Sequence, residues 1–322
     1  MNEARATVNA SENKEFRESY TGKGVTIAIL DTGLAPVDDL CYPENRILAF
    51  KDFINKKDKP YDDNAHGTHV AGIAAGNGHL SDGKYKGIAP EANIVSLKIL
   101  DAKGRGSGAD VLAGLQWVMD NRQRYNIRVA NLSIGTADMG SNDPLVRAVE
   151  HAWDNGIVMV IAAGNNGPDG STITSPGISK KVITVGASDD HKSVQIWGDS
   201  LVNFSGRGPT SECIVKPDII APGADIVSCL STTPDISPKR MEELKIVSDN
   251  YVRMSGTSMA TPVLSGAIAL LLEKYPHLYP DDVKFLLKKS ASNLHYSANQ
   301  QGWGLLNISN LLNQEGYHVR EQ

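Results

Sequence analysis

Three side chains that can act together on a carbonyl group occur in this 322-residue chain, each within a glycine-containing motif. Asp31 follows the apolar run VTIAIL, His66 lies in AHGTHVAG, and Ser258 lies in SGTSMATP. A hydroxyl nucleophile needs a base to take its proton and an acid to orient that base. The three residue types together predict acyl transfer to a serine.

Each of these residues also has a plainer interpretation. Asp31 could form a turn, and Ser258 could cap the helix that follows it. His66 and His69 could bind a metal, but no Glu lies between them to complete the zinc-protease pattern HExxH. Asn165, after the apolar run IVMVIAAG, could be a turn residue or a donor to an oxyanion. The four motifs occurring together favour the catalytic interpretation.

The elements that must position these residues alternate between strands and helices. Apolar runs rich in β-branched residues predict strands at 24–33, 93–100, 127–135, 157–165 and 181–188. Helical spacing predicts helices at 107–125 and 143–156, and further helices follow His66 and Ser258. This order predicts one α/β domain, a mainly parallel central sheet flanked by helices on both faces. Ligands of such sheets bind at the carboxyl ends of the strands, where Asp31 and Asn165 stand.

Composition excludes several other classes. The net charge of −5 provides no basic field for nucleic acid, and no apolar run reaches the roughly 18 residues that a membrane span needs. Cys41, Cys213 and Cys229 are odd in number and widely spaced, which predicts reduced thiols and a cytoplasmic location. The polar first 20 residues lack the apolar core of a secretory signal, although a processed secreted form would look the same.

Seven motifs together resemble the subtilisin family of serine proteases, and its bacterial intracellular branch in character. They are ILDTG around Asp31, HGTHVAG around His66, NLSIG around Ser133, AAGN around Asn165, NFSGRGP at 203–209, KPDIIAPG at 216–223 and GTSMATP around Ser258. The resemblance covers roughly residues 20–312. It implies a peptidase domain at 21–314, with a short N-terminal extension (1–20) and a C-terminal tail (315–322).

The resemblance implies a serine endopeptidase that cleaves protein or peptide substrates through an acyl-enzyme. Asp31 would orient His66, and His66 would act as general base and then as general acid. Ser258 would attack the peptide carbonyl. The Asn165 side chain and the Ser258 backbone N–H would form the oxyanion hole. No cofactor is needed for this chemistry.

The same resemblance implies where the substrate binds. Gly104, Arg105 and Gly106 would pair with extended substrate as an added strand. Two segments would flank the P1 side chain, and they consist of Ser133, Ile134, Gly135, Ala162, Ala163 and Gly164. These residues are small or apolar and include no acid, so the resemblance implies an apolar or large uncharged P1 residue. The aromatic P4 lid common in the family is replaced by Gly108, Ala109 and Asp110, which leaves the P4 preference open.

A structural calcium ion is a further expectation from the resemblance. Asp39 matches an acidic ligand position of the family, and Asn77 and Asp82 lie in a loop that could supply oxygen donors. The loop at 76–87 differs in length and composition from the family pattern, and a solvated polar loop is the equal alternative.

Two other functions remain open at this point. A serine esterase would share the chemistry, but the nucleophile elbow G-x-S-x-G fails here at Ala260. A catalytically silent binding protein of the same fold would have lost a triad residue, and none is lost. The extension at 1–20 could block the cleft as an inhibitor, or be the trimmed end of a precursor.

Overall fold

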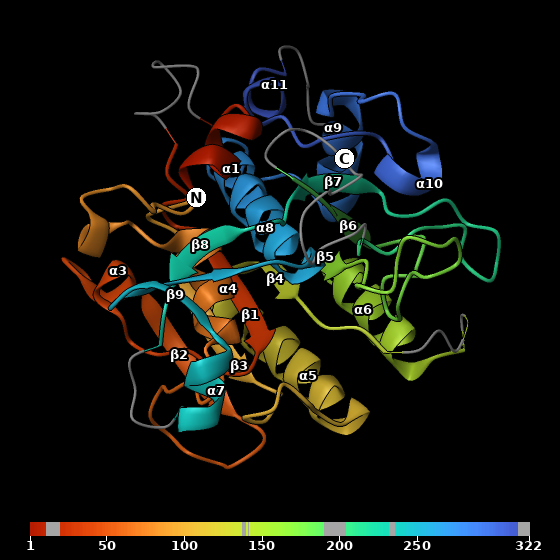
Figure 1. Ribbon diagram of the computed structural model, residues 1–322. Coiled ribbons are helices and arrows are strands. Elements are labelled where there is room, and N and C mark those ends of the chain that lie inside the picture. The colour runs from red at the N-terminus through yellow and green to blue at the C-terminus, as the bar shows by residue number, and fades with distance from the viewer. Residues whose placement is uncertain (11–19, 137–139, 141, 190–203, 232–235, 315–322) are drawn as a thin grey trace.

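A parallel sheet forms the centre of the protein (Figure 1). The computed structural model describes residues 1–10, 20–136, 140, 142–189, 204–231 and 236–314. Within them the sheet has seven strands in the order β2-β3-β1-β4-β5-β6-β7, and each neighbouring pair is parallel. The strands are β1 (Thr26–Asp31), β2 (Ile47–Asp52), β3 (Asn93–Lys98), β4 (Ile127–Leu132), β5 (Val158–Ala162), β6 (Ile183–Ser188) and β7 (Ile219–Pro222).

Helices cover both faces of this sheet, as the sequence predicts (Figure 1). On one face, α4 (His66–Ala75) and α8 (Thr257–Lys274) pack on each other and on the sheet. On the other face, α5 (Gly108–Tyr125) and α6 (Pro144–Asp154) do the same. Every residue of β1, β5 and β6 is buried between these layers, which explains why their sequences are almost wholly apolar.

The register of the sheet brings polar residues to one edge. β1 lies between β3 and β4, with Asp31 opposite Lys98 and Leu30 opposite Leu132. Since the strands are parallel, their carboxyl ends meet at this edge. Asp31 ends β1 there, and Ser133 follows β4 directly. The sheet therefore gathers residues from distant parts of the chain at one place.

A second sheet of three antiparallel strands packs beside α4, in the order β8-β10-β9. β8 (Ile226–Cys229) and β10 (Tyr251–Met254) pair directly, while the connection between them contains α7 (Pro238–Glu243) and the exposed strand β9 (Lys245–Ser248). Leu230 and Ile236 of this connection form a small core cluster with Ala65, which precedes α4, and with Val252 of β10. The other helices in the described residues are α1 (Asn2–Thr7), α3 (Asp38–Cys41), η1 (His79–Ser81), α9 (Pro280–Ser290), α10 (Ala298–Gln301) and α11 (Ile308–Leu312).

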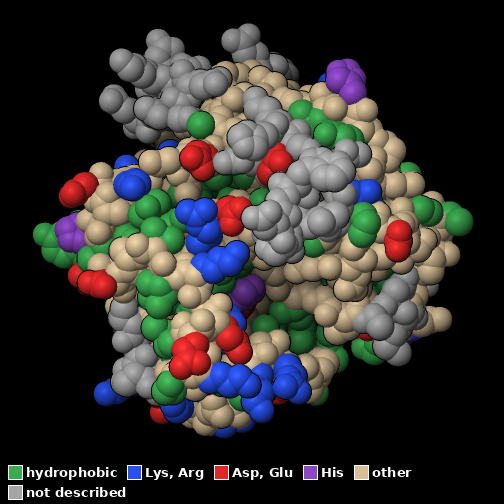
Figure 2. Space-filling view, in the orientation of Figure 1, with side chains coloured by type: hydrophobic (Ala, Val, Ile, Leu, Met, Phe, Trp, Pro, Cys, Tyr) green, Lys and Arg blue, Asp and Glu red, His purple; other side chains and the backbone are tan. Residues whose placement is uncertain are grey.

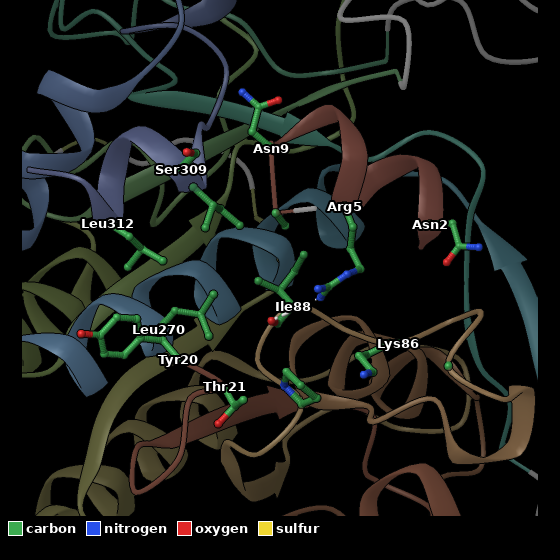
Figure 3. A pocket seen from close by; sticks show the side chains of 14 residues that line it. Asn2, Arg5, Asn9, Tyr20, Thr21, Lys86, Ile88, Leu270, Ser309 and Leu312 are labelled. Atoms are coloured by element: carbon green, nitrogen blue, oxygen red, sulfur yellow. Dashed lines mark hydrogen bonds between the residues drawn. The ribbon is translucent and has the colours of Figure 1, made fainter. Parts of the chain in front are cut away.

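The first ten residues pack against the domain rather than standing apart from it. Ala4 and Val8 are buried in the main core, and the Ile308 N–H donates to the Val8 carbonyl at 2.8 Å. Beside α1 lies a cavity of about 360 Å³ (Figure 3). Arg5 crosses it from α1 and donates to the Gly87 carbonyl. The residues that line this cavity include Tyr20, Leu270 and Leu312 but, in the part of the chain that the structure describes, neither His66 nor Ser258.

Two further features concern compartment and chemistry. Among the described residues, no helix combines the length and hydropathy that would carry it across a bilayer. Cys41, Cys213 and Cys229 are all unpaired thiols, and Cys229 alone of the three is buried.

Candidate active site

Asp31 and His66 form a hydrogen-bonded pair at the end of β1. The Asp31 carboxyl is completely buried, and its Oδ1 accepts hydrogen bonds from His66 Nδ1 and the Thr32 N–H, both at 2.7 Å. His66 is the first residue of α4, and its side chain is 23% exposed. With Nδ1 donating to Asp31, Nε2 is the ring nitrogen left to act as a base.

The environment of His66 changes its proton affinity. Burial alone would lower the pKa of His66, because it disfavours the charged ring. The Asp31 charge and hydrogen bond act the other way and prevail, so the pKa lies above the ordinary 6.5. Asp31 therefore both orients the ring and stabilises its protonated form.

Ser258 lies inside α8 and does not cap it. The helix begins at Thr257, its N-cap is Gly256, and no side chain makes a capping hydrogen bond there. Gly256 has a φ of 155°, and a Cβ on it would lie 3.3 Å from Nδ2 of Asn165. Glycine thus lets the chain enter the helix close to Asn165. The cap interpretation of Ser258 is wrong, because the N-cap is Gly256; Ser258 lines a cavity.

Ser258 and Ser133 exchange two hydrogen bonds. The Ser258 hydroxyl donates to the Ser133 carbonyl at 3.2 Å, and the Ser133 hydroxyl donates to the Ser258 carbonyl at 3.1 Å. The second bond compensates for Pro262, which has no N–H to donate to this carbonyl four residues earlier. Asn131, fully buried on β4, donates through Nδ2 to the Ser133 hydroxyl at 2.9 Å. Hydrogen bonds that run from Asn131 through Ser133 to Ser258 therefore hold the start of α8 against the sheet.

Asn165 follows β5 and has a fixed amide orientation. Its Oδ1 accepts from the Thr257 N–H at 2.9 Å and from the Thr257 hydroxyl at 3.0 Å. Since a backbone N–H can only donate, the oxygen must face Thr257, and Nδ2 is turned the other way. The amide of Asn165 and the N-terminal end of α8 can thus present two N–H donors, from Asn165 and Ser258, to one oxyanion.

One cavity of about 650 Å³ contains His66, Asn165 and Ser258 together. Figure 2 shows it as a hollow with a histidine side chain inside. The binding residues suggested by the sequence that line it are Gly104, Arg105, Gly106, Ser133, Ile134, Gly135, Ala162 and Gly164. Ala163 does not line it, because this residue is fully buried in a core cluster with Val146, Ile173 and Ile178.

The structure adds a residue to the predicted P1 pocket. Thr174 lines the cavity between the two flanking segments, and the sequence gives no spacing signal for it. A Cβ on Gly135 would lie 2.2 Å from its hydroxyl oxygen, and one on Gly164 would lie 2.6 Å from its methyl carbon. Glycine at these positions lets Thr174 enter the pocket wall.

The far end of the cavity lies at the start of α5. Gly108 and Val111 line it together with Leu100. Asp110 does not, because its carboxylate accepts from the Ser107 hydroxyl at 2.6 Å and completes a capping box. Among the described residues, Ser107 also lines this end, so the wall there combines aliphatic residues with one hydroxyl-bearing residue.

The residues expected to hold calcium have other partners. Asp39 is fully buried; its Oδ1 accepts from the Leu80 N–H at 2.8 Å, and its Oδ2 accepts from the Tyr251 hydroxyl at 2.7 Å. Asn77 Oδ1 accepts from the His79 N–H at 2.9 Å.

A fixed positive charge also lies beside these residues. The Arg46 guanidinium donates to the backbone carbonyls of Asp39, at 2.6 Å, and Ala75, at 2.7 Å. Asp82 is exposed on the loop. Among the described residues, no group of three or more His, Cys, Asp or Glu side chains could hold a metal ion. This arrangement does not fit a calcium site built on Asp39 and Asn77.

His69 has a structural role that excludes a metal pair with His66. Its ring is fully buried, and Nε2 donates to the carbonyls of Ile226 at 3.0 Å and Val252 at 3.2 Å. Burial lowers the pKa of His69 to about 3, so the ring is neutral. It joins α4 to β8 and β10 and points away from the cavity residues.

Comparison with known proteins agrees with this geometry. The profile of the subtilase family, peptidase S8, matches residues 22–304. Serine protease AprX of Bacillus subtilis (strain 168) is 44% identical over 318 residues, which cover 96% of this chain and 71% of AprX. Subtilisin DY of Bacillus licheniformis is 34% identical over 298 residues, covering 92% and 93%.

Solved structures show the same fold. An S41 psychrophilic protease superimposes with a TM-score of 0.75 at 30% identity, over 95% of this chain and 97% of its own. A cold adapted subtilisin-like serine proteinase gives a TM-score of 0.69 at 29% identity, over 90% of each chain.

Proposed function

Because this chain belongs to the subtilase family of serine-type endopeptidases, we propose that Asp31, His66 and Ser258 are its catalytic triad. The observation that carries the proposal is the 2.7 Å bond from His66 Nδ1 to buried Asp31, because His66 and Ser258 line the same cavity. The fold brings together three residues that the sequence places far apart.

In this mechanism the Ser258 hydroxyl turns from the Ser133 carbonyl toward His66. Nε2 takes the hydroxyl proton as Oγ bonds to the peptide carbonyl carbon. His66 then passes that proton to the leaving nitrogen, the C–N bond breaks, and an acyl ester on Ser258 remains. Water attacks the ester in the same way, with His66 again taking and returning the proton. Asp31 stays ionised throughout and stabilises the protonated ring.

The tetrahedral oxyanion would lie between Asn165 Nδ2 and the Ser258 N–H. Thr257 supports this role because it holds the Asn165 amide oxygen by two hydrogen bonds. A donor that is fixed before the reaction costs no reorganisation when charge develops on the oxygen.

Substrate selection would follow from the cavity walls. We propose that the P1 side chain enters between the segments 133–135 and 162–164, with Thr174 in the wall. The wall is uncharged, so large uncharged or apolar P1 residues are preferred. The segment 104–106 would bind extended substrate through its backbone.

The compartment is also part of the proposal. Three unpaired thiols, including the exposed Cys213, agree with a reducing cytoplasm. Cell fractionation with an antibody against the protein tests this, and recovery from the medium alone would contradict it.

The decisive experiment labels the purified protein with a fluorophosphonate probe and maps the labelled peptide. The label should appear on Ser258, and it should be absent from Ser258→Ala and from heat-denatured protein. Labelling of a different residue would reject the triad. Casein and short apolar peptides then separate the peptidase from an esterase, because an esterase would cleave only the corresponding esters.

A further inference from the structure

Arg240 reaches the active-site cavity from α7, in the connection between β8 and β10. Its Nε donates to the Asn64 carbonyl at 3.2 Å, and its Nη2 donates to Asn64 Oδ1 at 3.3 Å. Asn64 is itself fixed, because its Nδ2 donates to the Ala102 carbonyl at 2.9 Å. The guanidinium is thereby held at Asn64, which lies two residues before His66 in the sequence. Its positive charge opposes protonation of the His66 ring.

The charge around the cavity is opposite to that of the whole chain. The charged side chains among its described lining residues, histidine aside, are Lys103, Arg105 and Arg240, all positive. The chain as a whole has a net charge of −5. Figure 2 shows Lys and Arg side chains on two sides of the hollow, with some Asp and Glu side chains nearby. A cleft lined by one sign of charge attracts a ligand of the other sign.

The Arg240 guanidinium retains hydrogen-bonding capacity for a ligand. It has five N–H donors; among the described residues, Asn64 accepts from two of them and Glu243 Oε2 accepts from one at 3.3 Å. The Arg240 side chain is 27% exposed, and Glu243 is 53% exposed. An ion pair as exposed as this one with Glu243 is weak, so a substrate carboxylate can compete for the guanidinium. Arginine suits that role because its planar fork matches a carboxylate.

Arg240 is separate from the P1 pocket. It binds at Asn64 and not at the segments 133–135 or 162–164. In an extended substrate, alternate side chains point to opposite sides. If P1 enters its pocket, the side chains at P2 and P1′ point away from that pocket and toward the remaining wall.

We propose that Arg240 is a specificity-determining residue that selects substrates with an acidic side chain at P2 or P1′, next to the scissile bond. This inference rests on the proposed function, because it requires the triad to cleave the chain that Arg240 binds. It adds an acidic preference that the uncharged P1 pocket does not supply.

The test compares fluorogenic peptides that share an apolar P1 residue and carry Glu or Gln at P2, or at P1′. At one of these positions the wild type should have a kcat/KM about fivefold higher for Glu than for Gln. Arg240→Gln should bring this ratio to about one, and Arg240→Glu should reverse it and favour Lys. In the wild type, raising the ionic strength should also lower the ratio, since salt screens exposed charges.

Lys239→Gln is the matched control, because Lys239 is an exposed neighbour on the same helix and its substitution removes the same charge. It should keep the wild-type ratio. Arg240→Lys covers the case in which Arg240→Gln fails to fold, since it keeps the charge and should keep part of the preference. No cleavage of either the Glu or the Gln peptides by wild type would reject the proposed function itself. Cleavage without a Glu preference at either position, or a preference unchanged in Arg240→Gln, would overturn the role of Arg240 alone.

Discussion

The hydroxyl of Ser133 occupies the place of the N–H that Pro262 lacks. It donates to the Ser258 carbonyl at 3.1 Å, while the Ser258 hydroxyl donates back to the Ser133 carbonyl at 3.2 Å. The end of β4 and the start of α8 are therefore tied at the proposed nucleophile. A proline in the interior of a helix would otherwise leave this partly buried carbonyl without a donor.

This relationship predicts an energetic coupling between Ser133 and Pro262. Ser133→Ala should lower the free energy of unfolding by about 1–3 kcal/mol, because the Ser258 carbonyl loses its donor. In a Pro262→Ala background the loss should be smaller by about 1 kcal/mol, because residue 262 then has an N–H for the same carbonyl. Urea unfolding of the four proteins measures this. All should carry Ser258→Ala to prevent self-digestion, and strictly additive effects would contradict the coupling.

Asn165→Ala should remove one oxyanion donor while leaving substrate binding nearly intact. We expect kcat to fall by about 10² to 10³, the range found when a subtilisin loses such a donor, with KM little changed. Thr257→Val is a second variant for this test. It removes the hydroxyl that helps to fix the Asn165 amide and should reduce kcat less than Asn165→Ala does. Steady-state kinetics on one apolar peptide suffices, and near-wild-type turnover of Asn165→Ala would reject the assignment.

The raised pKa of His66 predicts the pH dependence of cleavage. The ring must be neutral to act as a base, so kcat/KM should rise with pH, with a midpoint above 6.5. Asp31→Asn removes the main cause of the increase and should lower that midpoint, besides reducing kcat by about 10⁴. A profile from pH 5 to 10 tests both expectations. A wild-type midpoint below 6.5 would contradict the effect of the Asp31 charge.

The raised pKa of His66 also makes the stability of the fold depend on pH. The folded pKa of His66 is raised above the unfolded value, so its protonation stabilises the fold fully below about pH 6.5. This contribution is lost as pH rises through the folded pKa, which is where His66 becomes available for its proposed role as a base.

His69 predicts sensitivity to acid. Its folded pKa is about 3, against about 6.5 when unfolded, so the unfolded chain binds one more proton between these values. Stability should therefore fall by roughly 1.4 kcal/mol for each unit that the pH falls through this window. In a Ser258→Ala background, His69→Gln should reduce the slope by one proton between pH 4 and 6. His277→Gln, at an exposed histidine, should not; equal slopes in all three proteins would contradict the prediction.

The Asp39 cluster predicts stability that does not depend on calcium. Tyr251→Phe removes the shorter of two hydrogen bonds to buried Asp39 Oδ2, which also accepts from the Cys229 thiol at 3.5 Å, and should cost about 1–3 kcal/mol of unfolding free energy. Added calcium should not restore it, and chelation should leave the wild-type Tm unchanged. Tyr42→Phe, at a 52% exposed tyrosine, is the control and should have little effect. A clear fall of Tm on chelation would show that a metal contributes after all.

Much of the fold could be predicted because its signals are local. The strands around Asp31 and Asn165 are continuous apolar runs, and the helix at 107–125 begins one residue before α5. The sequence did not predict β2, because half-buried and exposed residues, the last of them Lys51, interrupt its apolar pattern. β7 has only four residues, too few for a period to be recognised.

The contacts that the sequence did not reveal join residues far apart in the chain. Ser133 and Ser258 are 125 residues apart, and Arg240 and Asn64 are 176 apart. No spacing rule relates such positions, so only the folded chain shows that they touch. Ala163 was assigned to the P1 pocket with its neighbours, but β5 ends just before it and the chain turns it into the core.

The connection between β8 and β10 is anchored directly beside the proposed general base. Its Leu230 and Ile236 share one small core cluster with Ala65, which precedes His66, and with Val252 of β10. Arg240 in the same connection donates to Asn64, on the other side of Ala65. The proposed selectivity and the proposed chemistry therefore share one mechanical support. We expect a loop of different length grafted here to change kcat together with the cleavage preference.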